Sequence, residues 1–157
     1  SFSLFGSLLE KAGIRVSRIE VDAAFGQERV ENLERETCRA IDSLFERHGF
    51  KWLPDVIFVE DDYQATGALF SLLSHGVKLP DDVRFATTKN CGNGPAMSIP
   101  LTCVEFNPVA AGEAIAQAAV NFLEGSEEKY DVASVSRYVI GDTFPEVNSV
   151  SKRKDES

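Results

Sequence analysis

The amino-acid sequence predicts an α/β fold with three layers, in which a mostly parallel sheet carries helices on both faces. Segments with apolar residues at helical spacing alternate with short runs rich in β-branched residues, an order typical of parallel sheets. The run Val-Ile-Phe-Val at 56–59 is apolar throughout, as expected for a strand buried on both faces. Asn107 followed by Pro108 is a strong helix start, with an N-cap residue and a proline in the first turn.

The first half of the chain predicts two helices and one strand. Residues 2–12 place apolar side chains on one stripe and stop at Gly13, so we expect a short helix. Residues 14–21 alternate apolar and polar side chains, which indicates a strand. The segment 27–48 again repeats apolar residues at helical spacing and ends before Gly49. Its outer face is densely charged, and we interpret it as a solvated helix face.

The second half continues the alternation beyond the strand at 56–59. A helix is expected over 63–75, stopped by a glycine, and a strand over 83–87. A glycine-containing loop at 90–98 precedes a short strand at 101–104, and the helix that begins at Pro108 runs to Leu123. A last strand is expected over 135–140.

The length of 157 residues fits one domain, or one lobe of a larger two-lobed protein. We expect one folded unit over residues 1–145 and a polar tail over 146–157. The sequence has no apolar run near the roughly 20 residues that span a bilayer, and no signal sequence opens it. Its three cysteines have no CxxC spacing, so the simplest expectation is a reducing, cytoplasmic setting.

The charge balance argues against direct DNA binding by this chain. It has 25 Asp and Glu against 16 Lys and Arg, a formal net charge of -9. Binding to a phosphate backbone depends on its neutralisation by basic side chains, so any contact with DNA would need a segment outside this chain. The two histidines stand far apart in the sequence, and we expect no metal site and no cofactor.

Polar side chains gather where three of the predicted strands end. Ligands of open parallel sheets bind beyond the carboxyl ends of the strands. That position selects residues 60–62, 88–90 and 105–107, which together offer carboxylates, an ammonium, amides and an aromatic ring. This combination suits a small polar ligand such as a sugar, whose hydroxyls need donors and acceptors and whose ring stacks on aromatics. The candidate ligand-binding residues are Asp61, Asp62, Lys89, Asn90 and Phe106.

Two other interpretations of these residues remain open. Asp61 and Gln64 form a variant of the capping box, so Asp61 can satisfy the first amides of its helix with or without binding a ligand. The acidic pair could also hold Mg²⁺ for phosphoryl transfer, but such sites generally need a third carboxylate from a neighbouring strand end. The next strand ends in Thr87-Thr88-Lys89 without one. No catalytic motif is present, and we expect a protein that is not an enzyme.

Four ordered segments resemble the sensor domain of LacI/GalR-family transcription regulators. Residues 54–69 are similar to the family run P-D-A-I-F-x-x-N-D-x-x-A-x-G-A-L, and residues 75–83 to H-G-x-x-V-P-D-D-V. Residues 100–104 resemble P-L-T-T-V, and Gly112 falls where the family has the glycine of its last long helix. Residues 139–143 match the closing strand less well, with glycine at 141 where the family usually has arginine.

The resemblance implies the C-terminal lobe of a periplasmic-binding-protein-like type I fold, with effector in a cleft between two lobes. Asp61 stands where the family commonly has an effector-binding Asn, and Asp62 is its usual Asp neighbour. Lys89 stands where the family often has an effector-binding Asp, and this reversed charge brings an anionic effector, or none, into consideration. The resemblance also implies that a DNA-binding head, the first lobe and the first strand of this lobe lie upstream, and that helix 108–123 packs on that first lobe.

The resemblance further implies a homodimer. The family dimerises partly through the helix after the acidic pair and the segment beyond it, here Thr66, Phe70, Leu73 and Met97. The alternative for Phe70 and Met97 is that they fill this lobe's own core. Our first hypothesis is therefore the effector-sensing and dimerising part of a LacI/GalR-type regulator that binds a sugar-like effector. The alternatives are a periplasmic solute-binding protein for sugar transport and, third, the Mg-dependent phosphoryl-transfer enzyme.

Overall fold

A computed structural model describes residues 2–21, 29–92, 94–125 and 136–146. Its centre is a four-stranded sheet in the order β1-β2-β3-β4. Strands β1 (Val56–Val59), β2 (Arg84–Asn90) and β3 (Thr102–Phe106) run parallel, and β4 (Ser136–Val139) runs antiparallel to β3. The predicted α/β fold with a mostly parallel sheet is confirmed. The expected strands at 56–59, 83–87, 101–104 and 135–140 all occur, with β2 extending three residues beyond its expected end.

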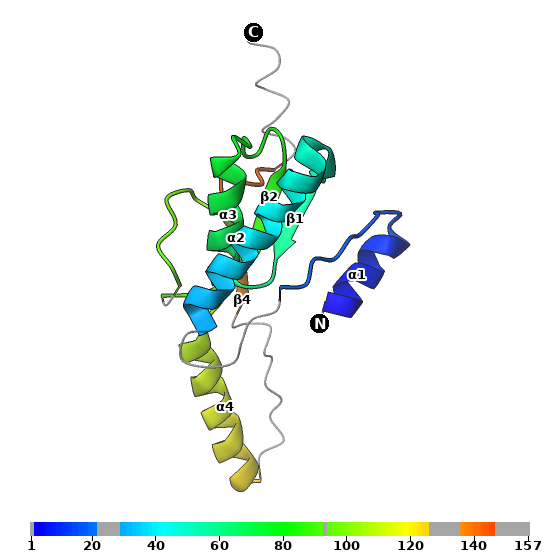
Figure 1. The fold of residues 1–157 in the computed structure, drawn as a ribbon. Helices are drawn as coiled ribbons and strands as arrows, with labels where there is room; N and C mark the ends of the chain where they lie inside the picture. Colours follow the sequence, from blue (N-terminus) through cyan, green and yellow to red (C-terminus); the bar gives the residue numbers. More distant parts are fainter. Residues whose placement is uncertain (1, 22–28, 93, 126–135, 147–157) are drawn as a thin grey trace.

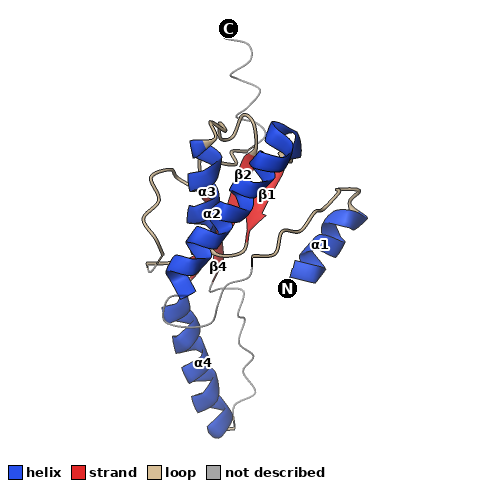
Figure 2. Ribbon diagram, viewed as in Figure 1, coloured by secondary structure: helices blue, strands red, loops and turns tan. Residues whose placement is uncertain are grey.

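Helices α2 (Arg29–His48) and α3 (Asp62–Ser74) pack against each other beside β1 and β2 (Figure 2). Both were predicted, and each is followed by a glycine with positive φ near the expected stop, Gly49 and Gly76. The apolar stripes of the two helices meet the side chains of β2 in one core, in which Leu72 and Phe85 are fully buried. Burying a side chain of this size stabilises the fold by about 1.5–3 kcal/mol.

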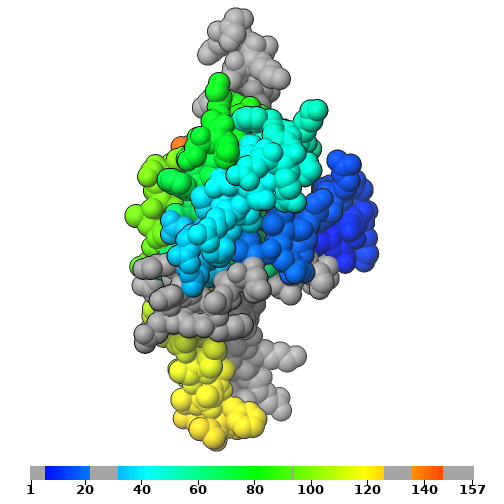
Figure 3. Space-filling model, in the orientation of Figure 1, coloured from blue at the N-terminus to red at the C-terminus, as the bar shows by residue number. Residues whose placement is uncertain are grey.

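Helix α4 (Pro108–Leu123) begins as predicted, with the Asn107 side chain accepting a hydrogen bond from the Ala110 backbone N–H. It projects away from the sheet and from α2 and α3 (Figures 1 and 3). None of its residues is buried, and Ile115 and Phe122 are 71% and 81% exposed. Helices α2 and α3 thus share one face of the sheet (Figure 2). Helix α4, in contrast, leaves its apolar side chains uncovered.

The strand expected over residues 14–21 does not form, and this prediction was wrong. Helix α1 (Phe2–Lys11) ends near Gly13 as predicted, and the chain then continues without helix or strand to residue 21. Alternating side chains favour an extended backbone, but a strand also needs a hydrogen-bonding neighbour. Among the described residues, the sheet ends at β1, whose one paired neighbour is β2.

Strand β1 is an edge strand rather than one buried on both faces. Val56 is 41% exposed, and its three following residues are half-buried. The all-apolar run therefore predicted strand β1 correctly but not its place at the edge of the sheet. Which residues cover a strand depends on segments far away in the sequence. Within the described residues, no helix is both long and apolar enough to cross a membrane.

Candidate ligand-binding site

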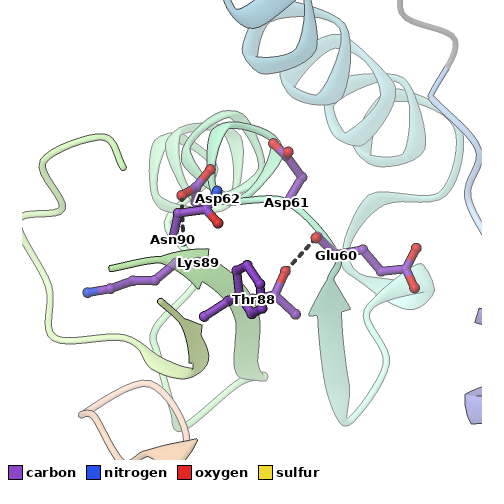
Figure 4. A pocket seen from close by; sticks show the side chains of 7 residues that line it. Glu60, Asp61, Asp62, Thr88, Lys89 and Asn90 are labelled. Atoms are coloured by element: carbon purple, nitrogen blue, oxygen red, sulfur yellow. Dashed lines mark hydrogen bonds between the residues drawn. The ribbon is translucent and has the colours of Figure 1, made fainter. Parts of the chain in front are cut away.

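A pocket of about 230 Å³ opens at the carboxyl ends of the three parallel strands (Figure 4). It lies where the topology predicts, beyond β1, β2 and β3. The structure brings all five candidate residues to this pocket. They line it together with Glu60 and Thr88, which belong to the same strand-end segments but were not singled out: Glu60, Asp61, Asp62, Thr88, Lys89, Asn90 and Phe106.

Asp61 caps helix α3. Its carboxylate Oδ1 accepts hydrogen bonds from the backbone N–H groups of Tyr63 at 2.9 Å and Gln64 at 3.1 Å. The capping interpretation of Asp61 is therefore confirmed. The cap uses one carboxylate oxygen, and a carboxylate has two, each with more than one acceptor direction. A ligand-binding role at the pocket is compatible with the cap and stays a prediction.

Asp62 is nearly fully buried and ties three segments together at the pocket. Its Oδ2 accepts a hydrogen bond from the backbone N–H of Asn90, at the end of β2, at 3.3 Å. The same oxygen would lie 2.7 Å from a Cβ atom added at Gly94, so the loop approaches closely here. Asp62 thus fixes the start of α3 against the end of β2.

Lys89 does not point its ammonium at the acidic pair. Its side chain runs along the pocket and away from Asp61 (Figure 4), and its Nζ lies 2.9 Å from Oε1 of Glu105. Arg137 binds the other oxygen of the same carboxylate, with its guanidinium 2.6 Å from Oε2. The three residues form one row because the sheet register pairs Lys89 with Glu105, and Glu105 with Arg137. We call this row the Glu105 triad.

The contacts within the Glu105 triad favour the charged form of its carboxyl. Hydrogen bonds from Lys89 first, and then from Arg137, hold the pKa of the Glu105 carboxyl below its usual range. The same contact with Glu105 raises the pKa of Lys89. Glu105 is only 8% exposed, so its carboxylate has little access to water. Lys89 therefore directs its ammonium at Glu105 rather than at the acidic pair, and the triad, with two cations and one carboxylate, keeps a net positive charge.

The remaining lining side chains supply sugar-like recognition chemistry. The Thr88 hydroxyl donates to the backbone carbonyl of Glu60 at 2.5 Å, which joins the ends of β1 and β2 (Figure 4). Asn90 and the half-exposed Phe106 stand side by side in the β2–β3 register. An amide beside an aromatic ring, with carboxylates opposite, is suited to a polyhydroxyl ring. Within the described residues, no group of three or more His, Cys, Asp or Glu side chains could hold a metal ion.

Of the residues predicted to form a dimer interface, some are exposed and others contact the core. Phe70 and Leu73 of α3 are 66% and 45% exposed, so the alternative that Phe70 fills the core is wrong. Met97 is half-buried and packs against the core, and its sulfur lies 3.6 Å from the Thr66 hydroxyl. The α3 surface therefore exposes two apolar side chains, and its role in dimerisation stays a prediction.

The family model described as a periplasmic binding protein-like domain matches residues 2–144 of this chain. The chain therefore belongs to the family of periplasmic binding protein-like domains. Its fold is that of LacI-family transcriptional regulators, among them one from Arthrobacter sp. FB24 in complex with lactose, with a TM-score of 0.66 and 18% identity. That likeness covers 90% of this chain and 49% of that one. No curated protein matches the chain by sequence.

Two further solved structures show the same fold. A LacI-family regulator from Lactobacillus casei with bound sucrose has a TM-score of 0.62 and 20% identity, covering 90% of this chain and 49% of that one. A sugar-binding LacI-family regulator from Escherichia coli, complexed with phosphate, has a TM-score of 0.66 and 15% identity, covering 92% and 49%. The chain spans about half the length of these structures.

Proposed function

We propose that this chain is the effector-sensing part of a LacI/GalR-type transcriptional regulator, and that its pocket binds a sugar or a related metabolite in a cleft against a second lobe. The observation that carries the proposal is the pocket itself, with carboxylates, an amide and an aromatic ring at the carboxyl ends of three parallel strands. Structures of this fold that contain lactose and sucrose support it. The pocket is smaller than the 300–1,000 Å³ typical of complete ligand sites, as expected for half of a cleft.

The proposed mechanism is linkage rather than catalysis. An effector that binds one arrangement of the two lobes more tightly shifts the population toward it, by no more than the difference in binding free energy. Contact with DNA, in this proposal, belongs to a separate head, since this chain has a net charge of -9. The exposed apolar side chains of α4, Ile115 and Phe122, are then the surface on which the other lobe packs. Because a transcriptional regulator acts on DNA, this proposal places the protein in the cytoplasm.

Weak sugar binding by the chain alone is the first expected result. Because one lobe supplies half of the contacts, titration with lactose or sucrose should give little or no heat in calorimetry. Two-dimensional NMR with millimolar sugar should nevertheless shift the backbone amides of Thr88 and Asn90. Substitution Asp61→Asn keeps an oxygen that can cap α3 and should alter these shifts without unfolding the chain. Nanomolar sugar affinity, or no shift at any pocket amide, would contradict the proposal.

Self-association through α3 is the second expected result. We expect sedimentation at micromolar concentration to show a homodimer, because Phe70 and Leu73 expose apolar surface worth about 25 cal/mol per Å² when buried. Substitution Phe70→Glu should shift the chain toward monomer by at least about tenfold in the dissociation constant. The control Ile19→Glu alters an apolar side chain that is also exposed, but outside α3. A monomeric parent chain, or equal effects of the two substitutions, would count against this interface.

A further inference from the structure

The Glu105 triad determines where Lys89, which lines the pocket, places its charge. Lys89 lines the pocket with its side chain, while its ammonium contacts the Glu105 carboxylate at 2.9 Å. Glu105 lies on the neighbouring strand and is itself held by Arg137 from the far side. Removal of Lys89 from this contact would break a charge-assisted hydrogen bond to a carboxylate with little access to water.

The charges that remain at the pocket are predominantly negative. Its lining residues include Glu60, Asp61, Asp62 and Lys89, and Glu60 turns its carboxylate away from the other three (Figure 4). With the Lys89 ammonium engaged by Glu105, an anion entering the pocket meets the carboxylates of Asp61 and Asp62, and like charges repel. A neutral polyol, or one carrying a positive charge, meets no such penalty.

We propose that Glu105 is the residue that sets the charge preference of this pocket: by holding the Lys89 ammonium aside, it makes the pocket accept neutral or cationic polyhydroxyl ligands and reject anionic ones. Glu105 does not line the pocket, so it acts through Lys89 and is a positioning residue. This inference deepens the proposed sugar-sensing function and rests on it for the identity of the natural ligand. It also answers the question that the reversed charge at position 89 raised, since the lysine does not confer affinity for anions.

Removal of the Glu105 charge should reverse the preference. In Glu105→Gln the amide keeps the size of the side chain but no longer attracts the ammonium. Lys89 has a flexible four-carbon stem and already runs along the pocket, so its ammonium can turn toward the ligand or toward Asp61. In either position it lowers the repulsion that an anion meets.

Inorganic phosphate is the probe, because its binding requires no recognition of a sugar ring. We expect Glu105→Gln to bind phosphate at least about tenfold more tightly than the parent chain, as judged by NMR shifts of the Thr88 and Asn90 amides. The double variant Glu105→Gln, Lys89→Met should lose this gain. Arg137→Gln is the matched control: it disrupts the same triad but leaves Lys89 bound to Glu105, and phosphate binding should stay weak.

Two outcomes would overturn the inference: equal phosphate affinity of Glu105→Gln and the parent chain, or a gain that persists without Lys89. If Glu105→Gln does not fold, Glu105→Asp provides the test, because its shorter side chain withdraws the carboxylate from Lys89 and should give a smaller gain in phosphate affinity. The proposed function fails separately. Pocket amides that do not respond to lactose or sucrose would refute sugar sensing, while the phosphate comparison would still decide the role of Glu105.

Discussion

Substitution of Gly67 by alanine is expected to destabilise the chain by about 3 kcal/mol, at the upper end of the cost of overpacking a core. Gly67 lies in α3 where that helix crosses α2, and a Cβ atom there would stand 2.0 Å from the backbone carbonyl oxygen of Glu34. The obstacle is main chain rather than a flexible side chain, so it cannot rotate aside. The two helices would have to separate, which loosens the core between them and β2.

Gly112 is the matched control for this substitution. It is also a helical glycine, in α4, but an added Cβ would meet nothing within 4 Å. Gly112→Ala should therefore stabilise the chain by up to about 1 kcal/mol through helix propensity alone. Urea unfolding followed by circular dichroism measures both variants. Similar effects of the two substitutions, in either direction, would show that the α2–α3 contact is less close than the structure indicates.

Local sequence signals predicted most of the elements correctly. Helices α2, α3 and α4 are predicted by the helical spacing of their apolar residues and by residues that start or end a helix, such as Asn107 and Gly49. These signals act within a few residues, so they can be interpreted without knowledge of the rest of the fold. The place of the pocket could also be predicted from the sequence. Parallel strands align their carboxyl ends, which brings together segments such as 60–62 and 88–90 that lie far apart in the sequence.

The features that the sequence predicted wrongly, or did not predict, all depend on contacts between distant segments. Residues 14–21 have the pattern of a strand but no paired neighbour in the sheet. The partner of Lys89 is fixed by strand register, which no local pattern encodes. The close approach of main chain at Gly141 is likewise visible only in the fold. A Cβ atom there would lie 2.4 Å from the backbone of Pro100 and Leu101, where the closing segment crosses the start of β3.

The segment after β4 is held to the sheet by the buried hydroxyl of Thr143. Substitution Thr143→Val should lower the free energy of unfolding by about 2–4 kcal/mol. The Thr143 Oγ1 donates to the backbone carbonyl of Phe85 in β2 at 2.8 Å and accepts from the backbone N–H of Thr102 in β3 at 3.1 Å. Thr143 has no exposed surface, so water cannot replace either bond. Valine has nearly the same shape but would leave a donor and an acceptor buried without this partner.

Thr143→Ser separates the hydroxyl from the methyl group. Serine keeps both hydrogen bonds and loses only one buried methyl, so it should cost about 1 kcal/mol. Chemical denaturation gives the two free energies, and hydrogen exchange at the Thr102 amide reports on the bond itself. Exchange should accelerate in Thr143→Val and remain near the parent rate in Thr143→Ser. Equal losses of stability in both variants would mean that packing of the methyl group, rather than the hydroxyl, holds the closing segment to the sheet.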